Sequence, residues 1–152
     1  MKNLKIIEAA TTAVGYIESP ANSNNTKFGK WFGLNGVAWC GIFVSWCYAQ
    51  AGLELGNLGF LKGFAGCQSA VAYFTKNKML TENPLPGDIV FFDWNGDGRY
   101  DHTGLYVKKL NETQFETIEG NTSLTNQSNG GSVMRRTRNT RNVLFVHPAV
   151  LN

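Results

Sequence analysis

The 152-residue sequence contains no run of about 20 consecutive apolar residues, the length that a membrane-spanning helix requires. Its first residues, MKNLKIIEAATTAVGY, combine a short apolar run with many polar side chains, unlike a signal peptide. We therefore expect no membrane insertion and no secretion through a cleaved leader.

Cysteine and histidine are scarce. The three cysteines, Cys40, Cys47 and Cys67, are odd in number and include no Cys-x-x-Cys pair, which argues against a disulfide scaffold and a zinc ribbon. The only histidines are His102 and His147, so a zinc enzyme would lack a ligand set with suitable spacing. A cysteine enzyme would have to draw its base from these two histidines.

Charge is sparse as well, because 16% of the residues are charged and the formal net charge is +3. Most of the basic excess lies in RRTRNTR, residues 135–141, without the interleaved aromatic residues typical of nucleic-acid-binding surfaces. We interpret this stretch as a solvated strand and turn, and we expect no nucleic-acid partner.

The composition predicts one globular domain, residues 1–152, since 43% of the residues are hydrophobic and no linker or repeat interrupts the chain. Helices are expected from the N-terminus to residues 15–19, at residues 40–51 and at residues 67–79, with an Asn- and Gly-rich loop at residues 19–36. The apolar face of the first helix is predicted from Leu4, Ile7, Ala10, Val14 and Ile17.

The second half of the chain reads as β-strands, because β-branched and aromatic residues alternate with polar ones between turn signals. Two hairpins are predicted, one across residues 111–113 and one across residues 139–142. Helices followed by antiparallel strands indicate an α+β fold with N-terminal helices packed on a small antiparallel sheet. The expected strands lie within residues 86–94, 102–110, 114–121, 132–138 and 143–148.

Cys40 occupies the position where chemistry is expected, the first turn of the helix in VAWCGIFVSWCYAQAG. A helix N-terminus carries partial positive charge and free N–H groups, which favour a thiolate and can stabilise an oxyanion. Cys47 lies two turns further along the same helix, and we expect it to be buried and inert.

His102 is the candidate base, because it begins a strand directly after a glycine-rich loop, where a side chain faces a cleft. His147 is interpreted as a structural histidine. Glu119 and Asn121 lie two residues apart on the strand expected to pair with that of His102, so they are predicted to share a face. Either side chain is then able to orient the imidazole.

The stretch DWNGDGRYD, residues 93–101, matches the start of a calcium-binding loop, D-x-[DN]-x-D-G. The glutamate expected at the twelfth position of such a loop is absent, because Gly104 occupies it. An Asx-rich turn without an ion is the alternative. The candidate calcium ligands are Asp93, Asn95, Asp97, the carbonyl of Arg99, and Asp101.

The motifs AWCGIFVSWCYAQAG, LPGDIVFFDW, DHTGLYV and TIEGN together resemble the CHAP domain, the cysteine, histidine-dependent amidohydrolase/peptidase family. The resemblance extends from about residue 8 to residue 148 and implies a papain-like fold. It also implies that Cys40 is the nucleophile, His102 the base, Glu119 the third catalytic residue and Asn121 the polar residue that follows it.

The resemblance further implies a function: hydrolysis of a peptidoglycan amide bond, as in phage endolysins and related bacterial enzymes. The bond is either the N-acetylmuramoyl-L-alanine link or one in the stem peptide or crossbridge. We expect synthesis in the cytoplasm of a bacterial host, action on the wall after release, and a C-terminal wall-binding domain outside this chain. Alternatives are a papain-like thiol amidase acting on a non-wall substrate and a catalytically silent wall-binding module.

Overall fold

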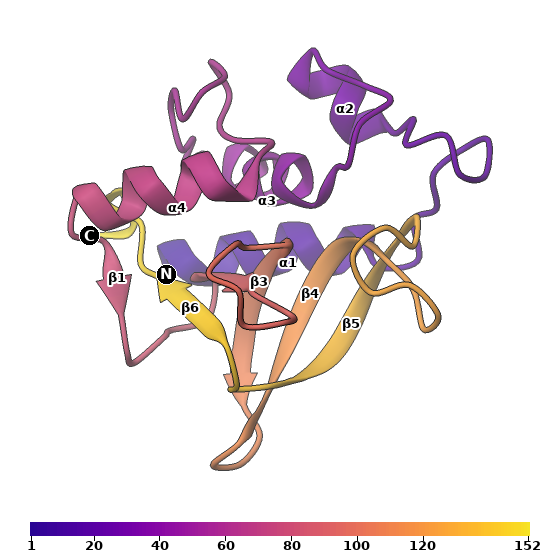
Figure 1. Ribbon diagram of the computed structural model, residues 1–152. Coiled ribbons are helices and arrows are strands. Elements are labelled where there is room, and N and C mark those ends of the chain that lie inside the picture. Colours follow the sequence, from indigo (N-terminus) through magenta and orange to yellow (C-terminus); the bar gives the residue numbers. More distant parts are fainter.

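Four α-helices pack on one face of a six-stranded antiparallel sheet in the computed structural model, which describes residues 1–152 (Figure 1). This confirms the predicted α+β class. None of the helices has the length and apolar character that crossing a bilayer demands. The helices are α1 (Lys2–Ala13), α2 (Lys27–Phe32), α3 (Cys40–Gln50) and α4 (Cys67–Lys76). The strands are β1 (Leu80–Thr81), β2 (Ile89–Phe92), β3 (His102–Lys109), β4 (Gln114–Thr122), β5 (Ser132–Asn139) and β6 (Val143–Val146), followed by a 3₁₀-helix at Ala149–Leu151.

Helix α3 is the centre of the helical layer, because its sequence CGIFVSWCYAQ is apolar around most of its circumference. It contacts α1, α2, β3 and β4. The helix closes at Ala51, and Gly52 then adopts a left-handed φ of +73°, as the sequence predicts for a C-terminal stop. This packing places the first turn of α3 beside the sheet.

Helix α2 corrects the prediction of a continuous loop at residues 19–36. It begins after Thr26, whose side-chain oxygen accepts a hydrogen bond from the Gly29 N–H at 2.9 Å and caps the helix. Phe28 and Phe32 are buried in the core and hold this short helix in place. Tertiary burial therefore overrides the loop-like composition around it.

Helix α1 forms at the N-terminus as predicted but ends at Ala13, before residues 15–19, and the predicted buried face is wrong at most positions. Leu4, Val14 and Ile17 are exposed, whereas Ile6, Ala10 and Ala13 are buried in the core. Both sets have helical spacing, so periodicity alone does not separate them. The small side chains on the buried face allow α1 to pack closely against α3.

The sheet has the strand order β1-β6-β2-β3-β4-β5. The predicted β3–β4 hairpin is confirmed, with Lys109 opposite Phe115 beside the turn. The predicted pairing of β5 with β6 is wrong, because β6 lies between β1 and β2, with Val146 opposite Ile89. Pairing with the apolar strand β2 buries Val146 completely, which the arginine-rich strand β5 does not offer.

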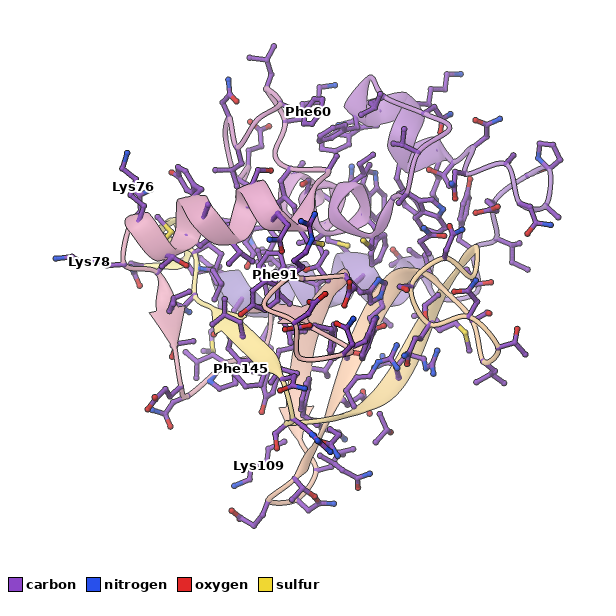
Figure 2. The ribbon with its side chains drawn as sticks, viewed as in Figure 1. Phe60, Lys76, Lys78, Phe91, Lys109 and Phe145 are labelled. Carbon is purple, nitrogen blue, oxygen red and sulfur yellow. The ribbon has the colours of Figure 1, made fainter.

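The sheet has an apolar cluster on each face. The larger one lies under the helices, and Figure 2 shows Phe91 between α4 and the sheet. The smaller one lies on the opposite face and includes Phe92 and Phe115, with Trp94 and Phe145 packed against it. Its rings stack closely: the centroids of Phe92 and Trp94 are 4.7 Å apart. This second cluster borders the site described next.

Candidate active site

Three of the predicted site residues meet where the first turn of α3 approaches the sheet. Cys40 is the first residue of α3, His102 is the first residue of β3, and Glu119 lies within β4. Cys40 is 4% exposed, and both His102 and Glu119 are 0% exposed. The fold therefore gathers from separate elements the three residues that the sequence singled out.

Two glycines permit this close approach. A Cβ atom at Gly120 would lie 2.7 Å from the Cβ of Phe43 and 2.9 Å from the ring of Trp39, so glycine lets β4 lie directly against α3. A Cβ atom at Gly104 would lie 2.5 Å from the Cγ of Glu119, so glycine leaves space for that side chain. Steric constraints therefore explain why the DHTG and EGN motifs have glycine at these two positions.

The imidazole of His102 is held at one nitrogen and free at the other. Its Nε2 donates to Oε1 of Glu119 at 2.9 Å, while its buried Nδ1 is left with no close partner other than the Cys40 thiol. Nδ1 is therefore the ring atom left to serve the neighbouring Cys40 thiol. The backbone of Thr103, the next residue of β3, also hydrogen-bonds the Cys40 sulfur.

Neighbouring groups favour the charged forms of both partners. A hydrogen bond from the Cys67 thiol lowers the pKa of Cys40; burial opposes this, and hydrogen bonding and charge from His102 lower the pKa further, to well below that of a free thiol. Burial disfavours the imidazolium, but hydrogen bonds and charges from Cys40 and Glu119 outweigh it and raise the pKa of His102 to about 9. A thiolate–imidazolium pair near neutral pH follows.

Arg138 stabilises the ionised form of Glu119, although its sequence position predicted a solvated strand. The guanidinium donates from Nε to Oε2 at 2.8 Å and from Nη2 to Oε1 at 2.6 Å. The Thr117 hydroxyl also donates to Oε2. Burial alone would raise the pKa of Glu119, but the hydrogen bonds from Arg138 and His102 lower it to about 2.

The interpretation of residues 135–141 as wholly solvated is therefore wrong at Arg138, whose side chain is 6% exposed. It holds for Arg135, which is 44% exposed and pairs with Glu116. A signal was present in the sequence: positions 134, 136 and 138 share one face of a strand, and a buried carboxylate needs a cationic partner.

Asn121 does not reach His102. Its amide donates to Oδ1 of Asn129 at 3.2 Å, and its own Oδ1 accepts from the Gly131 N–H at 3.2 Å. The pairing of β4 with β5 shifts register between Glu119 and Thr122, and Asn121 has a left-handed φ of +57°. The alternation rule fails at this irregularity, so of the two predicted orienting residues only Glu119 contacts the imidazole.

The remaining histidine and the second α3 cysteine lie outside the site, as expected. His147 hydrogen-bonds Asp88 through Nδ1 at 2.6 Å and Asn152 through Nε2 at 3.1 Å. Cys47 is fully buried, and burial raises its thiol pKa well above the ordinary value. Neither side chain is available to the Cys40–His102 pair.

The loop at residues 93–101 closes on itself. Asp93 accepts from the N–H groups of Asp97 and Gly98 at 3.2 and 2.8 Å, and the Asn95 amide donates to both Asp93 and Asp97 at 3.1 Å. Asp101 accepts from the Trp94 N–H at 3.0 Å. Three of the predicted ligands thus converge, but no group of three or more His, Cys, Asp or Glu side chains forms a metal cluster.

Cys67 is the site neighbour that the sequence analysis missed. It is the first residue of α4, and its thiol hydrogen-bonds the Cys40 sulfur. The adjacent Gln68 accepts a hydrogen bond from the Tyr100 N–H, which ties the start of α4 to the loop before His102. The bond to Cys40, burial and the nearby charge of Asp101 raise the pKa of Cys67, so it stays a thiol and a donor.

We expect Cys67→Ala to raise the pKa of Cys40, because the substitution removes a hydrogen bond that stabilises the thiolate. The pH profile of Cys40 alkylation by iodoacetamide should move to higher pH. Mass spectrometry of the Cys40 peptide measures it. Cys47→Ala is the matched control and should leave the profile in place; an unchanged profile in Cys67→Ala contradicts the assigned hydrogen bond.

The arrangement suits acyl transfer. A thiolate at the first turn of α3 faces a protonated imidazole, and the imidazole is oriented by a carboxylate that is itself fixed. The N–H groups at the start of a helix lack intrahelical partners and are available to a developing oxyanion. These are the components that hydrolysis of an amide through a thioester requires.

Comparison with known proteins agrees with this chemistry. A family model described as the CHAP domain matches residues 32–121, more than half of the chain. The matched range contains Cys40, His102 and Glu119, and it ends before β5 and Arg138. No curated protein matches the chain.

Proposed function

Because the chain belongs to the CHAP domain family, and that family implies amidohydrolase or peptidase activity, we propose that it hydrolyses an amide bond of bacterial peptidoglycan with Cys40 as nucleophile. The observation that carries this proposal is the buried chain of contacts from Cys40 through His102 to Glu119 at the start of α3. The bond is either the N-acetylmuramoyl-L-alanine link or one in the stem peptide or crossbridge.

In the proposed reaction, the Cys40 thiolate attacks the amide carbonyl carbon and forms a tetrahedral oxyanion near the first N–H groups of α3. Nδ1 of His102 then gives its proton to the leaving nitrogen, the C–N bond breaks, and a thioester remains. A water molecule then loses a proton to Nδ1 of His102 and attacks the thioester. This step releases the carboxylate product and restores the Cys40 thiolate.

The test is mass spectrometry of fragments released from purified Gram-positive peptidoglycan, with Cys40→Ala run in parallel under reducing conditions. New peptide N-termini from the wild type alone support the proposal, and the residue at each new terminus, with or without a free lactyl carboxylate on muramic acid, identifies the bond. Sedimentation of the protein with intact wall but no release of fragments indicates a binding module. Rapid alkylation of Cys40 with no action on wall and no binding to it points to a thiol amidase for another substrate.

The site of action follows from the same proposal. A wall hydrolase would be made in the cytoplasm of a bacterial host and would act on the wall after release. Fractionation of expressing cells, with zymography of each fraction on embedded peptidoglycan, tests this point.

We further propose that residues 93–101 bind Ca²⁺ through Asp93, Asn95, Asp97, the Arg99 carbonyl and Asp101. The side chains of Asp93, Asn95 and Asp97 lie close together, which supports this, as does the left-handed φ of +84° at Gly98. Since a bound ion stabilises the folded state, Ca²⁺ should raise the unfolding temperature of the wild type.

Asp97→Asn should lose that response to Ca²⁺, while Glu112→Gln, at the exposed tip of the β3–β4 hairpin, should keep it. Differential scanning fluorimetry with Ca²⁺ or with a chelator measures the shift. If the wild type unfolds at the same temperature with Ca²⁺ and with the chelator, the calcium proposal is rejected and residues 93–101 form an Asx-stabilised turn without an ion.

A further inference from the structure

Arg138 is a buried cation that donates three hydrogen bonds, one from each of its three nitrogens. Its Nε and Nη2 donate to the two carboxylate oxygens of Glu119, and its Nη1 donates to Oε1 of Gln127 at 3.0 Å. Its side chain is 6% exposed. Removing a guanidinium from water is costly, so the fold retains this group only with close compensation from its surroundings.

The contacts of Arg138 lead directly to the imidazole. Oε1 of Glu119 accepts from Nη2 of Arg138 at 2.6 Å and from Nε2 of His102 at 2.9 Å. One oxygen therefore joins the two cations. Because the guanidinium fork is planar and bidentate, it fixes both the position and the plane of the carboxylate that orients His102.

Two aromatic rings cover both cations. The guanidinium carbon of Arg138 lies 4.9 Å from the ring centroid of Trp94 and 5.5 Å from that of Phe92. The ring of His102 lies 6.0 Å from that of Trp94 and 5.9 Å from that of Phe92. The aromatic faces favour the cationic forms and restrict the movement of both side chains.

We propose that Arg138 is a positioning residue that keeps Glu119 ionised and aimed at Nε2 of His102, so that Nδ1 serves Cys40. This inference rests on the proposed cysteine chemistry. It goes beyond the family match, which ends at residue 121 and so does not include β5. Arg136, the other arginine near Glu119, bonds Thr122 and Ser123 instead and makes no hydrogen bond to the carboxylate.

Arg138→Gln should lower kcat about 100-fold with little change in KM, because the imidazole loses its fixed orientation while substrate contacts remain. Glu119 would keep only His102 as a counter-ion, so its protonation should occur about 1–3 pH units higher. In a plot of the rate of Cys40 alkylation by iodoacetamide against pH, the acid limb should therefore move to higher pH. Alkylation needs no peptidoglycan, so it tests the positioning role even where the substrate proposal fails.

Arg138→Lys separates charge from geometry. A lysine keeps the positive charge but lacks the fork, so we expect the acid limb to return most of the way to the wild-type position while kcat stays depressed. Arg135→Gln is the matched control: it removes the same charge from the same strand at an exposed site, and both readouts should stay at wild-type values.

Circular dichroism and the unfolding temperature establish which variants are folded. A folded Arg138→Gln with wild-type kcat and a wild-type alkylation profile overturns the proposal. If Arg138→Gln does not fold, Arg138→Lys is the deciding variant. A wild-type kcat in Arg138→Lys would show that the bidentate guanidinium is not required and would overturn the proposal. A shifted alkylation profile in a protein that releases no wall fragments supports the positioning role and rejects the substrate.

Discussion

We expect Cys40→Ala to abolish measurable hydrolysis of peptidoglycan, a loss of at least about 10⁴-fold, because the substitution removes the atom that forms the thioester. His102 and Glu119 would remain in place, but neither supplies a comparable nucleophile. Release of free amines from purified wall measures the rate. Because only one sulfur is lost at the edge of the core, the variant should still fold.

Cys47→Ala is the control for this result. It makes the same chemical change in the same helix, at a fully buried residue whose thiol pKa is raised. We expect it to cost about 1 kcal/mol of stability and to keep wild-type activity at temperatures where it is folded. Wild-type rates in Cys40→Ala, or an equal loss in folded Cys47→Ala, would reject Cys40 as the nucleophile.

The second large effect is on pH dependence. Hydrolysis should fall as the pH rises through about 9, since His102 then loses the proton that the leaving amine requires. On the acid side, activity should persist to well below the ordinary thiol range, because the pKa of Cys40 is lowered. Measurement of kcat/KM against pH gives both limbs, and an alkaline limb near the ordinary histidine value contradicts the ion pair.

Glu119→Gln tests the origin of the alkaline limb. Removing the carboxylate should bring the pKa of His102 down toward its ordinary value of 6.5, so the limb moves to lower pH. The rate loss should be smaller than in Cys40→Ala, because orientation of the base is only part of the barrier. The variant leaves Arg138 buried without its counter-ion, at a cost of about 3–5 kcal/mol.

Glu116→Gln provides the comparison, since it removes a carboxylate from the same strand that pairs with exposed Arg135. It should leave the pH profile and the stability nearly unchanged. An unmoved alkaline limb in folded Glu119→Gln, with wild-type behaviour in Glu116→Gln, would show that Glu119 does not set the charge of His102.

The same two groups link stability to pH. The pKa of Glu119 is lowered from 4.5 to about 2, so its contribution is complete above about 4.5 and is lost as the pH falls through 2. The pKa of His102 is raised from 6.5 to about 9, so its contribution is complete below about 6.5 and is lost as the pH rises through 9. Together they favour the folded state most between those ordinary values.

The sequence was informative where function depends on local structure. Cys40 at a helix start, His102 at a strand start and Glu119 on the next strand were all predictable, because each follows from periodicity and turn residues close by. Asn121 was misplaced, because a register shift reverses the alternation within one residue of Glu119. A bulge of this kind has no reliable local pattern.

Contacts between residues far apart in the sequence were the second feature that could not be predicted. Arg138 and Cys67 are separated from the residues they contact by 19 and 27 positions, and nothing local distinguishes them from a surface arginine or a structural cysteine. The place of β6 in the sheet depends on competition between two neighbouring surfaces for one short apolar strand. Such competition is decided by burial in the assembled core rather than by propensity.

The position of β6 has a consequence for how the protein is made. The strand closest to the end of the chain fills the gap between β1 and β2, so the sheet cannot close until it has left the ribosome. Until then β1 has no partner and β2 has a free edge on one side. During synthesis, Cys40, His102 and Glu119 therefore leave the ribosome before the strand that completes the sheet, so the domain reaches its final strand order only after β6 has been made.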